Sequence, residues 1–121
     1  MESIDKVKCY HAHIYFQNED EEQRAKKLQQ AAIAEFEDVD PEYWIDEPRG
    51  PHPVPNFVME FMCDQHPNVV PWLSLNRQGL NVLVHPRTGD SAPDHTARAI
   101  WMGERLAVKY DLDDGTPSAE E

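Results

Sequence analysis

The sequence predicts a mixed α+β domain in which two helices pack on one face of a small sheet. Short segments alternate apolar and polar residues with the period of two that is typical of strands. Between them lie segments with apolar residues at helical spacing, divided by loops rich in proline and glycine. The 121 residues suit one compact domain, which we place at residues 1–110. Residues 111–121 form an acidic tail, which we expect to be disordered.

The first predicted strand covers residues 8–16 and has two different faces. Its residues fall into two alternating sets: Tyr10, Ala12, Ile14 and Phe16, and Cys9, His11, His13 and Tyr15. A helix over about residues 18–37 follows, with Asn18 as its N-cap candidate and acidic residues in its first turn. The segment 38–56 is a loop, although residues 43–45 have the composition of a short strand.

The second half of the chain continues the pattern. Alternation predicts a strand over residues 57–62. A helix over 69–77 would hold Pro71 in its first turn, where a missing N–H is tolerated. The remaining expected elements are a strand over 80–85, a helix over 93–102 and a strand over 106–110.

This order, β-α-β-β-α-β, is typical of the ferredoxin-like α+β sandwich. Helices cover one face of such a sheet and leave the other open. Because an open apolar face usually packs against a second copy, we expect a homodimer.

Charge and cysteine content limit the partners and the location. The formal net charge of −12 argues against nucleic acid and anionic membranes, which bind basic surfaces. No apolar run is long enough to span a bilayer, and the first residues lack the features of a signal peptide. Cys9 and Cys63 have no CxxC spacing, so we expect both to be reduced and buried in a cytoplasmic protein.

Histidines carry the strongest functional signal. His11 and His13 lie two apart on a predicted strand, so both side chains point to one face, about 7 Å apart. Two polar aromatic residues there cost stability unless they are used. Prolines on both sides of His52 restrict its backbone, and His85 ends another predicted strand. Imidazoles bind iron, zinc, copper and nickel, so these residues are candidate metal ligands.

Other candidates are less specific. His95, at a predicted helix start, is either a site residue or a structural one, and His66 is set aside as structural. Glu60 is either a ligand or base, or a solvent-facing strand residue. Arg49 and Arg77 would suit a substrate carboxylate, although solvated structural roles are more common. Two tryptophans, Trp72 and Trp101, are expected in the core, and no phosphate loop or Ser-His-Asp pattern is present.

An ordered set of short motifs resembles the DOPA 4,5-dioxygenase family over about residues 7–110. The motifs are His11-Ala12-His13-Ile14-Tyr15-Phe16, Gly50-Pro51-His52-Pro53, Pro71-Trp72-Leu73, Leu83-Val84-His85-Pro86, Thr88-Gly89-Asp90, Asp94-His95-Thr96 and Ala99-Ile100-Trp101-Met102-Gly103. The resemblance implies a dimeric α+β barrel of ferredoxin-like fold. It also implies an extradiol dioxygenase that uses Fe(II) and O₂ to open a catechol ring beside its two hydroxyls.

The resemblance makes four histidines candidate metal-site residues: His11, His13, His52 and His85. A pocket histidine, either one of the His11–His13 pair or His95, would move the catechol proton, because an ordinary imidazole pKa near 6.5 suits that role. Zinc or another divalent metal is an alternative to iron. The other hypotheses are a metal- or small-ligand-binding module without turnover, a zinc enzyme using the same pocket, and an interaction domain with incidental histidines.

Overall fold

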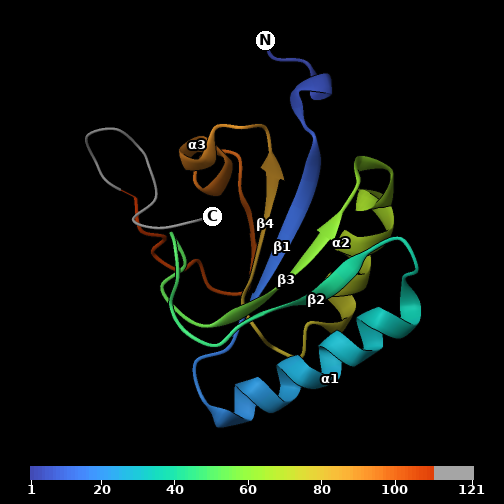
Figure 1. The fold of residues 1–121 in the computed structure, drawn as a ribbon, viewed down its shortest axis with the longest axis vertical. Coiled ribbons are helices and arrows are strands. Elements are labelled where there is room, and N and C mark those ends of the chain that lie inside the picture. The colour runs from blue at the N-terminus through green and yellow to red at the C-terminus, as the bar shows by residue number, and fades with distance from the viewer. Residues whose placement is uncertain (111–121) are drawn as a thin grey trace.

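A five-stranded antiparallel sheet with strand order β2-β3-β1-β4-β5 organises the molecule (Figure 1). The computed structural model describes residues 1–110, apart from the side chains of Pro41 and Glu42. Its strands are β1 (Cys9–Tyr15), β2 (Asp40–Ile45), β3 (Asn56–Phe61), β4 (Val82–Arg87) and β5 (Ile100–Met102). Its helices are α1 (Glu19–Glu35), α2 (His66–Asn76) and α3 (Ser91–His95). The order β1-α1-β2-β3-α2-β4 confirms the ferredoxin-like α+β fold, to which β5 adds one edge strand.

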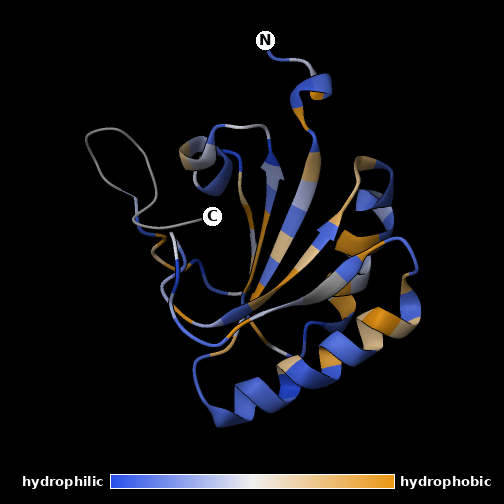
Figure 2. Ribbon diagram, in the orientation of Figure 1, coloured by the Kyte–Doolittle hydropathy of each residue, from blue (hydrophilic) through white to orange (hydrophobic). Residues whose placement is uncertain are grey.

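The hydrophobic core lies between the sheet and helices α1 and α2. Figure 1 shows these two helices on one side of the sheet and α3 on the other. Ala12 and Ile14 of β1 are fully buried in this core, as the alternation predicts. From α1, Leu28 packs against them at helical spacing from Ala25 and Ala32. In Figure 2 apolar colour accordingly appears as bands along β1, β3 and β4 and on helices α1 and α2.

The predicted N-cap of α1 is confirmed. The Asn18 side chain accepts a hydrogen bond from the backbone N–H of Glu21, and the Glu21 carboxylate accepts one from the N–H of Gln17. These reciprocal bonds satisfy N–H groups that a helix start leaves unpaired. In residues 1–110 none of the helices combines the length and hydropathy that a bilayer-spanning segment needs.

The prediction of a helix over 93–102 and a strand over 106–110 is wrong. Helix α3 ends at His95, and the chain then enters β5, where Trp101 pairs with Leu83 of β4. Sheet hydrogen bonds therefore replace helical ones. Because β5 occupies the edge beside β4, the following segment forms no strand, and the Lys109 N–H donates to the Pro51 carbonyl instead.

Other boundaries differ from the prediction in position. Helix α2 begins three residues earlier than expected, so Pro67 occupies its first turn and Pro71 lies inside it. Strand β4 lies two residues later than expected, which places His85 within the sheet. Both cysteines are free as expected, but Cys63 is exposed rather than buried. The acidic tail at 111–121 lies outside the described residues.

Candidate metal centre

The open face of the sheet carries histidines on two neighbouring strands. Alternation along β1 sends His11 and His13 to this face because the residue between them points into the core. The register places His11 directly opposite His85 of β4 on one side and Glu60 of β3 on the other. Directly opposed residues have side chains within contact distance, so the sheet itself assembles three imidazoles.

Two more histidines reach the same place from outside the sheet. His52 comes from the loop between β2 and β3, and His95 is the last residue of α3. The His52 ring stacks on His13 with centroids 3.8 Å apart, and His95 lies over His85 at 3.9 Å. Four side chains of the cluster are 0–1% exposed: His13, His52, His85 and His95.

The cluster contains two candidate metal-binding triads that share His13. One consists of His11, His13 and His85, and the other of His13, His52 and His95, with ring nitrogens of each triad within 4.8 Å of one another. The five histidines that the sequence singled out therefore converge. His66 instead packs against Tyr10, at a centroid distance of 4.5 Å.

The imidazoles of His13 and His85 face each other with the lone pairs of their Nε2 atoms. Nδ1–H of His13 donates to Oδ1 of Asn56 at 2.9 Å, and the Asn56 amide is oriented by its own donation to the Val54 carbonyl. Nδ1–H of His85 donates to the Pro86 carbonyl at 2.9 Å. A neutral imidazole carries one N–H, so Nε2 of each ring is an acceptor. These two Nε2 atoms lie 3.1 Å apart, and a cation between them would relieve the repulsion of their lone pairs.

The donor set fits a transition-metal ion. Bonds of about 2.0–2.1 Å from each Nε2 to one ion would span the 3.1 Å gap at an angle between the octahedral and tetrahedral values. His11 approaches edge-on, with its centroid 5.8 Å from that of His13 and 5.4 Å from that of His85. Its Nε2 is hydrogen-bonded to Glu60 at 3.2 Å, and its Nδ1 is buried. The outer nitrogen of each imidazole is the ring nitrogen that faces away from the cluster. An oxygen partner on that nitrogen is typical of metal-ligating histidines.

Burial keeps the imidazoles in the neutral form that a metal ion requires. Loss of hydration lowers the pKa of His13 and His85 well below the usual range, and neighbouring imidazoles lower it further. The same causes lower the pKa of His52 to about 3. Burial also raises the pKa of the Tyr15 phenol, so its hydroxyl stays protonated.

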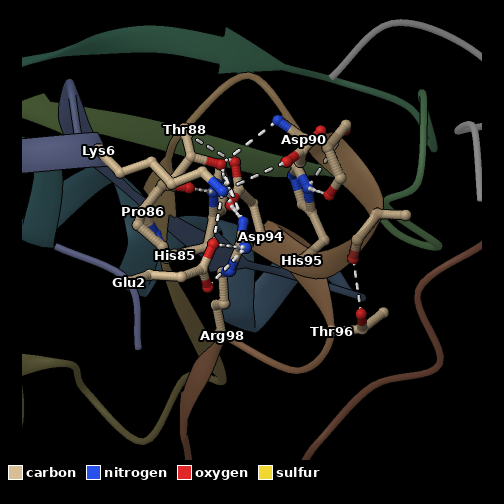
Figure 3. A network of polar contacts seen from close by, with 12 residues as sticks. Glu2, Lys6, His85, Pro86, Thr88, Asp90, Asp94, His95, Thr96 and Arg98 are labelled. Carbon is tan, nitrogen blue, oxygen red and sulfur yellow. Dashed lines mark hydrogen bonds and ion pairs between the residues drawn. The ribbon is translucent and has the colours of Figure 1, made fainter. Parts of the chain in front are cut away.

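A buried carboxylate fixes α3 and with it His95 (Figure 3). Asp94 is 1% exposed and accepts hydrogen bonds from the backbone N–H and the hydroxyl of Thr88, both at 2.8 Å. Arg98 also donates to Asp94 at 3.0 Å, and its other nitrogen binds Glu2. Because His95 directly follows Asp94, this network holds the imidazole over the sheet.

The end of the described chain closes over the cluster. The Tyr110 hydroxyl donates to the Ser91 carbonyl of α3 at 2.8 Å, and its ring lies 5.6 Å from that of His95. The Lys109 N–H binds the loop that carries His52. These contacts tie the two covering elements together.

Of the predicted polar site residues, only Glu60 touches the cluster in the described contacts. Its carboxylate is half-exposed and is held at a lowered pKa mainly by its hydrogen bond with His11. Arg49 is exposed and pairs with Glu47, while Arg77 donates to the Leu80 carbonyl. Their substrate-binding roles stay predictions.

Sequence reasoning missed two residues that orient histidines. Asn56 fixes His13, and the Tyr15 hydroxyl lies 2.7 Å from Nδ1 of His52. The alternation on β1 indicated that Tyr15 shares a face with the histidines, although nothing local marked Asn56.

These observations define the class of this protein: a ferredoxin-like α+β domain with a buried histidine cluster suited to a transition metal. Residues 10–112 match the Dopa 4,5-dioxygenase family. The crystal structure of a "putative dioxygenase" from Nostoc punctiforme superposes with a TM-score of 0.84 at 40% identity, covering 89% of this chain and 92% of that one. The chain therefore belongs to the Dopa 4,5-dioxygenase family.

Two fungal proteins are also similar. An uncharacterised 21.2 kDa protein of Botryotinia fuckeliana is 38% identical over 86% of this chain, and the DOPA 4,5-dioxygenase of Amanita muscaria is 34% identical over 80% of it. The chain spans only 62% and 46% of the lengths of these two relatives.

Proposed function

We propose that this protein is a dioxygenase that uses Fe(II) and O₂ to open the ring of DOPA or a related catechol beside its two hydroxyls. The observation that carries the proposal is the pair of buried Nε2 lone pairs on His13 and His85, 3.1 Å apart. Family membership and the names of the fungal and cyanobacterial relatives support the dioxygenase reaction.

In this proposal, the ion is held by His11, His13 and His85. All three lie on sheet strands, which hold side chains more precisely than loops do. Their centroids are 5.1 to 5.8 Å apart, as suits rings that converge on one ion. The rings of His52 and His95 instead lie against those of His13 and His85, with centroids 3.8 and 3.9 Å apart, and in this proposal they contact the substrate.

Bound there, Fe(II) supplies Lewis acidity and the electron transfer that lets O₂ react with a catecholate. The protein supplies a proton acceptor. Nδ1–H of His95 donates to the Ser91 carbonyl at 2.8 Å, which leaves the lone pair on Nε2. His95 therefore takes the proton of a catechol hydroxyl through Nε2. The hydrogen bonds of Thr88 to the neighbouring Asp94 hold His95 in place.

The elements covering the site exclude water from the reaction. The His52 loop, α3 and the contacts of Lys109 and Tyr110 leave the central histidines almost without solvent exposure. Because water is excluded, charge–dipole interactions with the substrate are stronger. The same burial implies that these elements move aside when the substrate enters.

The test is oxygen uptake and ultraviolet–visible spectroscopy of iron-loaded protein with DOPA and simpler catechols. We expect a yellow ring-opened product and one O₂ consumed per catechol. His13→Ala should abolish both iron binding and product, whereas His66→Ala, outside the cluster, should retain both. Tight iron binding without product from any catechol would contradict the proposed reaction.

A second candidate is a zinc protein, either a hydrolytic enzyme or a binding module without turnover. The all-imidazole set favours zinc as well as iron, so the ligands do not choose between them. Metal analysis of purified protein, together with oxygen uptake after iron reconstitution, separates the two. Bound zinc and no oxygen uptake after reconstitution would favour this candidate.

Two further expectations stay predictions. A homodimer is supported by exposed apolar residues such as Tyr43 and Ile100, and light scattering after gel filtration measures it. A cytoplasmic location is supported by the free thiols of Cys9 and Cys63, and fractionation of cells tests it.

A further inference from the structure

His52 differs from the other clustered histidines in the group that faces its outer nitrogen. An oxygen that can only accept faces the outer nitrogen of His13 and of His85. At His95 the Ser91 carbonyl, 2.8 Å away, is nearer than the Ser91 hydroxyl at 3.5 Å. The outer nitrogen of His52 is instead 2.7 Å from the hydroxyl of Tyr15, which can donate.

The Tyr15 hydroxyl decides the position of the His52 proton. Tyr15 is 1% exposed, and His52 is its only hydrogen-bond partner among residues 1–110. A buried hydroxyl needs an acceptor, because an unpaired one costs about 1–3 kcal/mol. Tyr15 therefore donates to Nδ1, and the single proton of neutral His52 lies on Nε2.

That Nε2–H points into the cluster without an acceptor among the described residues. The Nε2 atom of His52 is buried and makes no hydrogen bond to any of them. One ring nitrogen of His52 lies within 4.8 Å of ring nitrogens of His13 and His95. A buried donor at this place can bind an acceptor on a molecule that enters the cluster.

We infer that His52 is a hydrogen-bond donor to a substrate oxygen rather than a metal ligand, and that Tyr15 is the positioning residue that fixes its tautomer. The substrate half of this inference rests on the proposed function. A catechol oxygen that accepts from Nε2–H of His52 would lie near Nε2 of His95, the proposed proton acceptor. As that oxygen becomes anionic, the hydrogen bond from His52 strengthens, because bonds to charged acceptors are the stronger ones.

This inference differs from the expectation that His52, like His13, is a metal-site residue. Both histidines are buried and their rings stack, so burial and proximity do not separate them. The group that faces the outer nitrogen of each ring does separate the two histidines. A ligand nitrogen must offer a lone pair, and the Tyr15 hydroxyl leaves none on Nε2 of His52.

The first test measures tautomers in metal-free protein by long-range ¹H–¹⁵N NMR of the imidazoles. We expect the Nε2–H form for His52, assigned by the loss of its signal in His52→Gln, and the Nδ1–H form for His13 and His85. Tyr15→Phe should release His52 into a mixture of both forms. A His52 proton on Nδ1 in the wild-type protein would overturn the inference, whether or not the protein is a dioxygenase.

The second test separates donor from ligand with Zn(II) and 4-nitrocatechol as probes. His52→Leu removes the donor and His52→Gln restores an N–H, with His66→Gln as the distant control. We expect one bound Zn(II) in all three, and 4-nitrocatechol binding to the iron-loaded protein weakened about 10- to 100-fold in His52→Leu and partly rescued in His52→Gln. If His52→Leu misfolds, the zinc content of His52→Gln decides.

Loss of zinc from a folded His52 variant would refute the donor role, because that loss is expected when a proposed ligand is replaced, as in His13→Gln. Unchanged 4-nitrocatechol affinity in folded His52→Leu would refute it as well. If the wild-type protein binds neither metal nor catechol, the proposed function fails, and the tautomer measurement still judges the role of Tyr15.

Discussion

Asn56 offers the sharpest test of the metal centre because it acts on a proposed ligand without touching the ion. Its side chain is fully buried, and Oδ1 accepts the Nδ1–H of His13 at 2.9 Å. Asn56→Leu keeps the branching of the side chain at Cγ but removes the acceptor. His13 then either leaves its N–H unpaired or moves the proton to Nε2, where a metal ion needs the lone pair.

Two magnitudes follow from this geometry. An unpaired buried N–H should lower the free energy of unfolding of the metal-free protein by about 1–3 kcal/mol. Loss of an orienting partner should weaken metal affinity about 10- to 100-fold. Asn56→Asp keeps an acceptor at the same place and should change metal affinity by less than about threefold, which is below the range expected for Asn56→Leu.

The assay combines urea unfolding without metal with a Zn(II) titration against a chromophoric chelator. Asn68→Leu is the matched control, because Asn68 is exposed on α2 and should leave zinc affinity unchanged. If Asn56→Leu binds Zn(II) as tightly as the wild type, then His13 does not hold the ion through Nε2 and the reasoning fails.

Three further predictions follow. In metal-free protein the free energy of unfolding should fall as pH drops below about 6.5, because unfolded histidines then bind protons that buried His13, His52 and His85 do not. Each of these histidines should contribute about 1.4 kcal/mol per pH unit down to its pKa in the folded protein, which is about 3 for His52. Urea unfolding at about pH 7.5 and 5.5 measures this effect, and equal stability at the two pH values would contradict it. Leu28→Ala should lower the free energy of unfolding by about 2–5 kcal/mol, against less than about 0.5 kcal/mol for exposed Leu75→Ala, and equal effects in denaturant melts would argue against the core described above. Asp94→Ala should lower the free energy of unfolding by about 1–3 kcal/mol and reduce turnover more than iron content, because α3 then no longer holds His95 in place. Unchanged turnover would show that the contacts of Asp94 with Thr88 and Arg98 do not position His95.

Local patterns predicted the parts of the fold that depend on neighbours in sequence. Alternation on β1 placed Ala12 in the core and His13 on the open face, since a strand has only two faces. The capping residue Asn18 located the start of α1 because its hydrogen bond reaches only three residues ahead. The segment 93–102 was not predictable in this way. Its apolar residues suit a helix locally, but only residues 93–95 belong to α3, and pairing with β4 across the sheet makes residues 100–102 strand β5.

The sequence by itself indicated four of the histidines that gather at the site, through strand alternation, the proline-bounded loop and the ordered motifs, and it left the role of His95 open. Only the tertiary structure decided what each of them can do. The position of an imidazole proton depends on the group facing the other ring nitrogen, and that group comes from distant residues: Asn56 for His13 and Tyr15 for His52. The register of β1 with β3 sets the first of these contacts, and the fold of the β2–β3 loop against β1 sets the second. No spacing along one strand contains either of them.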